Sequence, residues 1–348
     1  MVQRISIKDV AKEAGVSTAT VSNVFSGKKP VNSDLVAKVK SVAEKLGFKI
    51  NKAASLLRSG KTRVVAVLVP DLKDTFFSTI VSELETQAFE DGYDVIVASS
   101  HNSLDAEVSR LNALMGWEPA GLIVVPCSGT IPEELVQINK EFPLVLVDRI
   151  ASENAIADTV TIDNFAAGEM AAQHVLELGH DDVLLVVSDL EFPPISERAN
   201  GAETIIETRT GLSPKILQLG SDMSKGAETF SRWLDKNGAP GAVIALNNVT
   251  SLSVLSAFAE KGIDIPGTTS FVAFDDYAWM SARNTGLTAV RQPADEIASA
   301  VWQRLKLRME DNSGVEITPT ILSAELIERA SVRTIDKESK EFGTRIAQ

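Results

Sequence analysis

Residues that cross-link chains or bind metal ions are scarce in this sequence. Its 348 residues include one cysteine, Cys127, and three histidines. One cysteine cannot form a disulfide within the chain, so we expect the protein to work in a reducing cytoplasm. His101, His174 and His180 have no metal-ligand spacing with Cys127, and the sequence predicts neither a metal site nor a cofactor.

Signals for membrane insertion, export and catalysis are missing as well. No run of 18 apolar residues occurs, and the first residues, Met1–Arg4, begin no apolar export segment. The sequence contains no G-x-S-x-G or H-E-x-x-H motif, and no G-x-G-x-x-G motif after an expected strand. We therefore expect a cytoplasmic protein that is not an enzyme and does not contact a membrane.

Positive charge is concentrated at the N-terminal end of the chain. Residues 1–62 hold 12 Lys and Arg against 4 Asp and Glu, a net charge of +8. The whole chain carries −13, so residues 63–348 carry −21. An ordinary solvated charge run does not predict this division. A basic segment on an acidic body suits contact with nucleic-acid phosphates by the basic segment alone.

Residues 6–25 have the pattern of two short helices around a tight turn. Ser6 and Asp9 form a capping box at the start of the first helix, and Gly15 ends it. Ser17 is a good N-cap residue for the second helix. At about 100° per residue, this helix turns a short polar face outward, made of Ala19, Ser22 and Asn23 with Thr18 beside them. Helical hairpins are common, but this one has a basic flank and predicts a helix-turn-helix for the DNA major groove.

A third helix and a short linker are expected to follow this pair. The third helix ends at Gly47 and completes a DNA-binding domain of residues 1–50. Residues 51–62 form a hinge helix and linker, too short to be a stable helix alone. The apolar pair in this segment, Leu56 and Leu57, either contacts the next domain or enters the minor groove as a wedge.

Beyond residue 63 the chain alternates short apolar runs with amphipathic stretches. The seven apolar runs are Val64–Val69, Asp94–Ala98, Leu122–Val125, Leu144–Val147, Val183–Val187, Ala242–Leu246 and Phe271–Phe274. Buried strands alternating with helices predict parallel sheets covered on both faces, and seven strands are too many for one small sheet. We therefore predict two doubly wound α/β subdomains, with a ligand bound in the crevice at the carboxyl ends of their strands.

Together these features resemble the LacI/GalR family of bacterial transcriptional regulators over about residues 5–333. The segments that carry the resemblance are Ile7–Ser17, Thr20–Ser22, Gly262–Pro266, Phe274–Asp276 and Leu287–Pro293. The resemblance implies a helix-turn-helix head on a periplasmic-binding-protein-like body, and a nucleoid-associated homodimer that binds a pseudo-palindromic DNA operator. We expect a repressor that is controlled by a small-molecule effector. Tetramers of the family add a heptad helix, a pattern that the tail Lys337–Phe342 lacks.

The resemblance places the DNA contacts in the second helix and in the hinge. The residues that it implies are Ser17, Thr18, Ala19, Thr20, Ser22, Asn23, Ala54, Leu57 and Arg58. Thr18, Ala19 and Asn23 would read bases, and Leu57 aligns with the intercalating leucine of the family. The family usually has arginine at the position of Asn23. Because asparagine favours adenine over guanine, we expect a half-site that differs from the commonest one.

The resemblance also implies a set of effector contacts. They are Phe76, Phe77, Asp148, Arg198, Asn248 and Asp275. Phe76 and Phe77 match aromatics that pack on the ligand, although ordinary core packing is the alternative for both. Asn248 matches a position that the family usually fills with aspartate. Asp74-Thr75 replaces the usual Asn-Pro, and Phe192-Pro193-Pro194 replaces a more polar loop, so the specificity side of the pocket is unusual. Aromatic rings together with Asp, Asn and Arg suit a sugar, polyol or sugar acid better than a purine.

In this family the chain crosses three times between the two subdomains. The crossings implied here are Thr161–Asp163, Val290–Pro293 and a point near Leu322. They give an effector-binding and dimerisation domain of residues 63–333, with an N-subdomain of about 63–161 and 292–322, a C-subdomain of about 162–291, and a disordered tail of 334–348.

The sequence leaves two aspects of regulation open. An effector can release the protein from DNA or strengthen its binding, because both couplings occur on the same scaffold. The alternative co-effector is a phosphoprotein, as in the catabolite-control branch of the family. It would dock on the N-subdomain.

Overall fold

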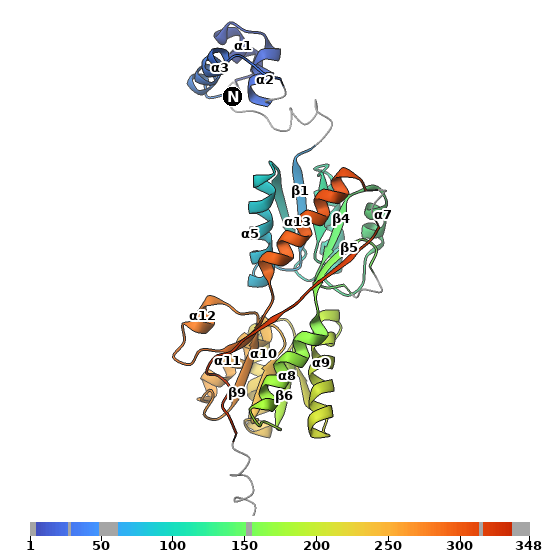
Figure 1. Ribbon diagram of the computed structural model, residues 1–348, viewed down its shortest axis with the longest axis vertical. Coiled ribbons are helices and arrows are strands. Elements are labelled where there is room, and N and C mark those ends of the chain that lie inside the picture. The colour runs from blue at the N-terminus through green and yellow to red at the C-terminus, as the bar shows by residue number, and fades with distance from the viewer. Residues whose placement is uncertain (1–4, 27–28, 49–61, 151–154, 313–315, 336–348) are drawn as a thin grey trace, which may run out of the picture. The chain divides into compact units, whose positions relative to one another are not determined.

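Figure 1 shows a computed structural model of the protein, which describes residues 5–26, 29–48, 62–150, 155–312 and 316–335. The chain divides into two compact units. We call residues 1–62 the head and residues 63–348 the body. Within the described ranges, no helix is both long enough and apolar enough to span a bilayer.

The head consists of three short helices, α1 (Ile7–Ala14), α2 (Thr18–Ser26) and α3 (Ser33–Leu46). α1 begins with the predicted capping box, in which the backbone N–H of Ser6 donates to the carboxylate of Asp9 at 2.8 Å. It ends at Gly15, whose φ of 67° lies in the left-handed region that glycine tolerates. The helices enclose the fully buried side chains of Val10, Ala14, Val21 and Val39. The three helices predicted within residues 6–47 are confirmed.

The first sheet of the body has six parallel strands in the order β11-β5-β4-β3-β1-β2. Its strands are β1 (Val64–Val69), β2 (Asp94–Ser99), β3 (Gly121–Val124), β4 (Leu144–Val147), β5 (Asp158–Ile162) and β11 (Pro319–Leu322). Its helices are α5 (Thr75–Glu90), α6 (Leu104–Met115), α7 (Glu133–Glu141) and α13 (Ala294–Glu310). Successive residues of β1 point to opposite faces, so Val67 packs in the cluster with α5 and α13, and Leu68 in the cluster with α6 and α7. Both faces of this sheet are therefore covered.

The second sheet also has six strands, in the order β12-β10-β9-β8-β6-β7, and only the β10–β12 pair is antiparallel. Its strands are β6 (Val183–Val187), β7 (Lys215–Gln218), β8 (Ala242–Ala245), β9 (Ser270–Phe274), β10 (Thr288–Arg291) and β12 (Glu325–Ile327). Its helices are α8 (Asn164–Glu177), α9 (Pro193–Thr210), α10 (Met223–Asn237), α11 (Asn248–Lys261) and the short α12 (Ala278–Ser281). The predicted fold class is confirmed, because a helical head precedes a body of two doubly wound sheets.

The chain passes three times between the two halves of the body, as Figure 1 shows. It leaves the first sheet after β5, returns after β10 to place α13 on that sheet, and leaves again after β11. Five strands were not predicted, namely β5, β7, β10, β11 and β12. They have three to five residues and carry polar side chains, and three of them lie at sheet edges.

The predicted hinge and most of the predicted C-terminal tail are not among the residues that the structure describes. The hinge segment up to residue 61 lies outside the described residues, and so do residues 336–348 of the expected tail. The first residues of that tail are described: the backbone N–H of Ile335 donates to the carbonyl oxygen of Leu178 at 2.7 Å.

Helices α8 and α9 approach each other closely at two glycines. A Cβ atom built on Gly168 would overlap the carbonyl group of Arg198, and one built on Gly201 would overlap that of Phe165. Because both obstacles are backbone atoms, a larger residue requires one helix to move. This approach fixes the position of α9, and with it the position of Arg198.

We expect Gly168→Ala to lower the free energy of unfolding by about 1–3 kcal/mol, because the added methyl group overpacks this crossing. Urea denaturation of the full chain measures the change. Gly116→Ala is a matched control, since Gly116 has a φ of −62° and its Cβ would make an ordinary contact, 3.4 Å from the carbonyl oxygen of Ala113. Equal midpoints for the two variants would contradict the prediction.

Candidate DNA-reading helix and ligand cavity

Helix α2 presents the polar face that the sequence predicts. The Oγ of Ser17 accepts a hydrogen bond from the backbone N–H of Thr20 at 3.0 Å and so caps the helix. Val21 is fully buried in the head. On this helix Thr18 and Ala19 are exposed, and Ser22 and Asn23 are half-buried. Val24 and Phe25 are also half-buried, but they pack against the core of the head. The other predicted DNA contacts, Ala54, Leu57 and Arg58, lie outside the described residues.

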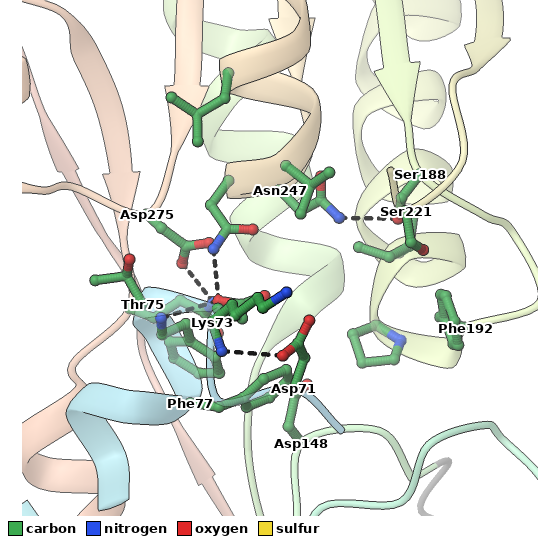
Figure 2. A pocket seen from close by; sticks show the side chains of 18 of the residues that line it. Asp71, Lys73, Thr75, Phe77, Asp148, Ser188, Phe192, Ser221, Asn247 and Asp275 are labelled. Carbon is green, nitrogen blue, oxygen red and sulfur yellow. Dashed lines mark hydrogen bonds between the residues drawn. The ribbon is translucent and has the colours of Figure 1, made fainter. Parts of the chain in front are cut away.

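A cavity of about 420 Å³ lies in the body, where the carboxyl ends of strands from both sheets meet. Asp148 directly follows β4, and Asp275 directly follows β9. Their φ values of 62° and 65° are in the left-handed region, which is costly for residues other than glycine and occurs mainly at functional sites. Figure 2 shows Asp275 and Asn247 on one side of the cavity, with Phe77 and Asp148 on the other.

The cavity brings together all six residues that the sequence suggested as effector contacts. They are Phe76, Phe77, Asp148, Arg198, Asn248 and Asp275. The two phenylalanines lie in the first turn of α5, and their rings are 5.4 Å apart. Both belong to the hydrophobic core and also line the cavity, and their contact with an effector stays a prediction.

Arg198 is the centre of a buried hydrogen-bond network below the cavity. Its Nε donates to Asn164 at 2.8 Å, its Nη1 to the carbonyl oxygen of Leu246 at 3.0 Å, and its Nη2 to Gln292 at 3.2 Å. Gln292 in turn donates to Asp275 at 2.6 Å. Every nitrogen of this guanidinium is therefore bonded, and the network holds Asp275 in place.

Burial raises the pKa of Asp275 to about 6, although the nearby charge of Arg198 opposes this shift. Burial also raises the pKa values of Asp74 and Asp148. The cavity therefore holds several carboxyl groups in a poorly solvated space, where a hydrogen-bond donor on a ligand would meet strong acceptors.

A hydrogen bond joins the two halves of the body across this cavity. The side-chain amide of Asn248 donates to Asp74 at 2.6 Å and lies 3.1 Å from the hydroxyl of Tyr277. Asp74 caps α5 by accepting from the backbone N–H of Phe76 at 2.9 Å. Asp74 and Asn248, two positions at which this sequence differs from the usual family residues, are therefore hydrogen-bonded to each other, and Asp74 also caps a helix.

Several cavity residues were not predicted from the sequence. They are Asp71, Lys73, Asn102, Arg149, Ser188, Ser221, Met223, Asn247, Val249, Leu252, Tyr277 and Gln292. Ser188 directly follows β6, and Gln292 directly follows β10. A search for the first polar residue after every predicted strand would therefore have found Ser188 but not Gln292, because β10 was not predicted. Arg149 gives no such signal, because its setting depends on Phe77 and Phe192 from distant parts of the chain.

The side chains that line the cavity suit the binding of a small molecule. It combines carboxylates, amides, hydroxyls and guanidinium groups with aromatic rings, and these groups suit a small polar molecule. The described ranges contain no cluster of three or more His, Cys, Asp or Glu side chains that could hold a metal ion. Cys127 is buried next to Glu107, and burial together with this carboxylate raises its pKa to about 12, so the thiol is not an activated nucleophile.

A helix-turn-helix head and a body with a ligand cavity between two α/β halves define a DNA-binding transcriptional regulator. Residues 6–51 match the family model described as bacterial regulatory proteins, lacI family. Residues 172–332 match that of the periplasmic binding protein-like domain.

The transcriptional regulator PtxS of Pseudomonas putida is 31% identical over 315 residues, which cover 90% of this chain and 91% of PtxS. Catabolite control protein A of Priestia megaterium is 30% identical over 307 residues, 86% of this chain and 91% of that protein. The chain belongs to the lacI family of bacterial regulatory proteins, and its relatives are regulators, not enzymes.

The structure of the Lac repressor dimer, bound to operator and the anti-inducer ONPF, has the same fold. Its TM-score with this chain is 0.83 at 20% sequence identity, and the match covers 95% of this chain and 100% of that one.

Proposed function

We propose that this regulator is a homodimeric repressor that binds a pseudo-palindromic operator and responds to a sugar, polyol or sugar acid in the body cavity. The observation that carries the proposal is the cavity, which gathers all six suggested effector residues. Its volume is within the usual range of small-molecule sites, about 300–1,000 Å³. The Lac repressor, which has the same fold, was solved as a dimer on its operator.

On the DNA side, the proposal gives base reading to Thr18, Ala19 and Asn23 on the outward face of α2. Ser17, Thr20 and Ser22 complete the contact, and Ala54, Leu57 and Arg58 act in the minor groove. Support comes from the small polar groups on this face and from the net charge of +8 on residues 1–62. An asparagine at position 23 pairs best with adenine, which has both a donor and an acceptor in the major groove.

On the effector side, the polar groups of the cavity match the hydroxyls of a sugar. Asp148 and Asp275 accept hydrogen bonds, and Asn247 both donates and accepts them. The rings of Phe76, Phe77 and Phe192 also line the cavity, and their apolar atoms suit the C–H groups of a sugar or polyol. Since these residues come from both halves of the body, a bound effector favours one arrangement of the halves over another, and this preference is the source of control.

A thermal-shift screen of the full chain against sugars, polyols, sugar acids and sugar phosphates tests the effector proposal. A ligand at about 100 times its Kd adds roughly 2.7 kcal/mol to the stability of the native state. Operator titrations by fluorescence anisotropy, with and without the hit, then give the sign of control. No shift with any compound, together with operator binding that requires an added phosphoprotein, would favour the catabolite-control alternative. A monomer in sedimentation at operator-binding concentrations would contradict the dimer.

Effector affinity should fall as the pH is lowered through the pKa of Asp275, about 6. Above this pH the carboxylate is ionised and accepts hydrogen bonds from ligand hydroxyls, whereas below it the group becomes neutral. Each pH unit below 6 should weaken binding by up to about tenfold. Calorimetric titrations of an uncharged hit at pH 7.5, 6 and 5 measure the effect, and equal affinity at all three would contradict it.

A further inference from the structure

Arg149 differs from Arg198, the other arginine of the cavity, in how few of its N–H groups form hydrogen bonds. It follows Asp148 at the carboxyl end of β4, and its Cζ atom lies 5.3 Å from the ring centre of Phe77 and 4.4 Å from that of Phe192. These two rings belong to opposite halves of the body. Both rings contact the guanidinium through cation–π interactions, which do not use its N–H groups.

The hydrogen bonds of Arg149 within the described residues come from one nitrogen only. Nη1 donates to the side-chain oxygen of Asn102 at 2.7 Å and to the carbonyl oxygen of Cys127 at 3.2 Å. Both acceptors are neutral. Nε and Nη2 make no hydrogen bond with the described part of the chain.

Arg149 is half-buried and lines the cavity, so a ligand bound there can reach its guanidinium. Nε and Nη2 are the donors that its hydrogen bonds to Asn102 and Cys127 leave for such a ligand.

The contrast with Arg198 shows which cation is available to a ligand. All three nitrogens of Arg198 are bonded inside the protein. Arg149 forms no ion pair within 4.0 Å in the described ranges, although Asp148 and Asp74 lie close enough to favour its charge. Oδ1 of Asp74 accepts from Asn248 and from the backbone N–H of Phe76 at the helix cap. The exposed Lys73 adds a second positive charge to the same cavity.

Resting on the proposed small-molecule effector, we propose that the effector is an anionic sugar derivative, with its carboxylate or phosphate bound by Nε and Nη2 of Arg149. Two parallel N–H donors match the two oxygens of such a group in a bidentate pair. The hydroxyls of the ligand lie toward Asp275 and Asn247. Arg149 is thus a specificity-determining residue that separates sugar acids and sugar phosphates from neutral sugars.

Matched pairs of anionic and neutral ligands test the role of Arg149 directly on the full chain. Gluconate against sorbitol, galactonate against galactitol, and glucuronate against glucose each differ in one carboxylate. Glucose 6-phosphate and ribose 5-phosphate test phosphate as the source of the anion. Calorimetry on the wild type, Arg149→Gln, Arg149→Lys and the exposed control Arg232→Gln gives the affinities.

We expect at least one acid or phosphate to bind the wild type about 10- to 100-fold more tightly than its neutral partner. Arg149→Gln should remove most of this preference, Arg149→Lys should restore part of it, and Arg232→Gln should leave it unchanged. Thermal unfolding verifies that each variant is folded. If Arg149→Gln does not fold, the proposal is tested by the affinities of Arg149→Lys and by the preference of the wild type for anionic ligands. Tighter binding of neutral members would overturn this inference but keep the proposed sugar effector. Absence of binding by every compound would overturn both.

Discussion

Replacing Asp275 with alanine should weaken effector binding by at least about 100-fold while operator binding is retained. The carboxylate is buried at the end of β9 and accepts from Gln292 at 2.6 Å. Its removal takes away a charged acceptor for the ligand. It also leaves the amide nitrogen of Gln292 without its acceptor and removes one of the negative charges near Arg198, so the floor of the cavity loses its order. The head has its own hydrophobic core, formed by residues far from position 275 in the chain.

Two further variants separate the loss of charge from the loss of structure. Asp275→Asn keeps the shape and an acceptor for Gln292, so it should retain more stability than alanine but still bind the effector weakly. Asp276→Asn is the matched control, because this neighbour pairs with Arg329 at 2.7 and 2.9 Å and does not line the cavity. Calorimetry measures effector affinity, and anisotropy measures operator affinity. An unchanged effector affinity for Asp275→Ala would refute the assigned role.

The sequence predicted those parts of the site that depend on local order. Asp148 and Asp275 follow strands that are continuous apolar runs, so the strand ends could be located, and the resemblance to the family implied that these two carboxylates contact the effector. The polar face of α2 also followed from local spacing, because Val21 and its apolar neighbours define the opposite face. In each case the pattern that supports the prediction lies within a few residues of the predicted residue.

The residues that were missed depend on contacts between distant segments. Gln292 follows β10, a four-residue strand containing Thr288 and Arg291 that has no distinctive apolar pattern. Arg149 is held by Phe192 from the other half of the body, and its unused donors can be identified only once all its partners are known. Edge strands such as β7 were missed because their exposed residues are polar. Pairing with a neighbouring strand, rather than propensity, makes them strands.

The contacts across the cavity suggest how a ligand could be sensed. Asn248 bonds Asp74 from the opposite half, and Arg149 lies over the ring of Phe192. A ligand that binds Arg149 and Asp275 competes with or adds to these contacts, so its binding energy depends on how the halves are arranged. Only such a difference in affinity between two arrangements can shift their populations. Effector recognition and control would therefore use the same residues.

Operator affinity should fall about 1,000-fold between 50 and 200 mM salt if the dimer neutralises about six phosphates, because log affinity falls with log salt at about −0.9 per phosphate. The described head has six exposed lysines: Lys8, Lys12, Lys29, Lys38, Lys40 and Lys45. None of them forms an ion pair with another described residue. The net charge of −21 on residues 63–348 disfavours DNA contact by the body, so the salt response should come from the head.

Anisotropy titrations over a salt series give this slope. Lys29→Gln, next to the helix-turn-helix, tests one charge. It should reduce the slope by about one unit for each protomer whose Lys29 contacts a phosphate, and should weaken binding to all DNA sequences about equally. Lys236→Gln, in α10 of the body, is the matched control and should leave the slope unchanged. Asn23→Ala should instead reduce discrimination between operator and random DNA with little change in slope, because a base contact releases no counterion. A flat salt response of the wild type would contradict the assignment of the basic head to the DNA backbone.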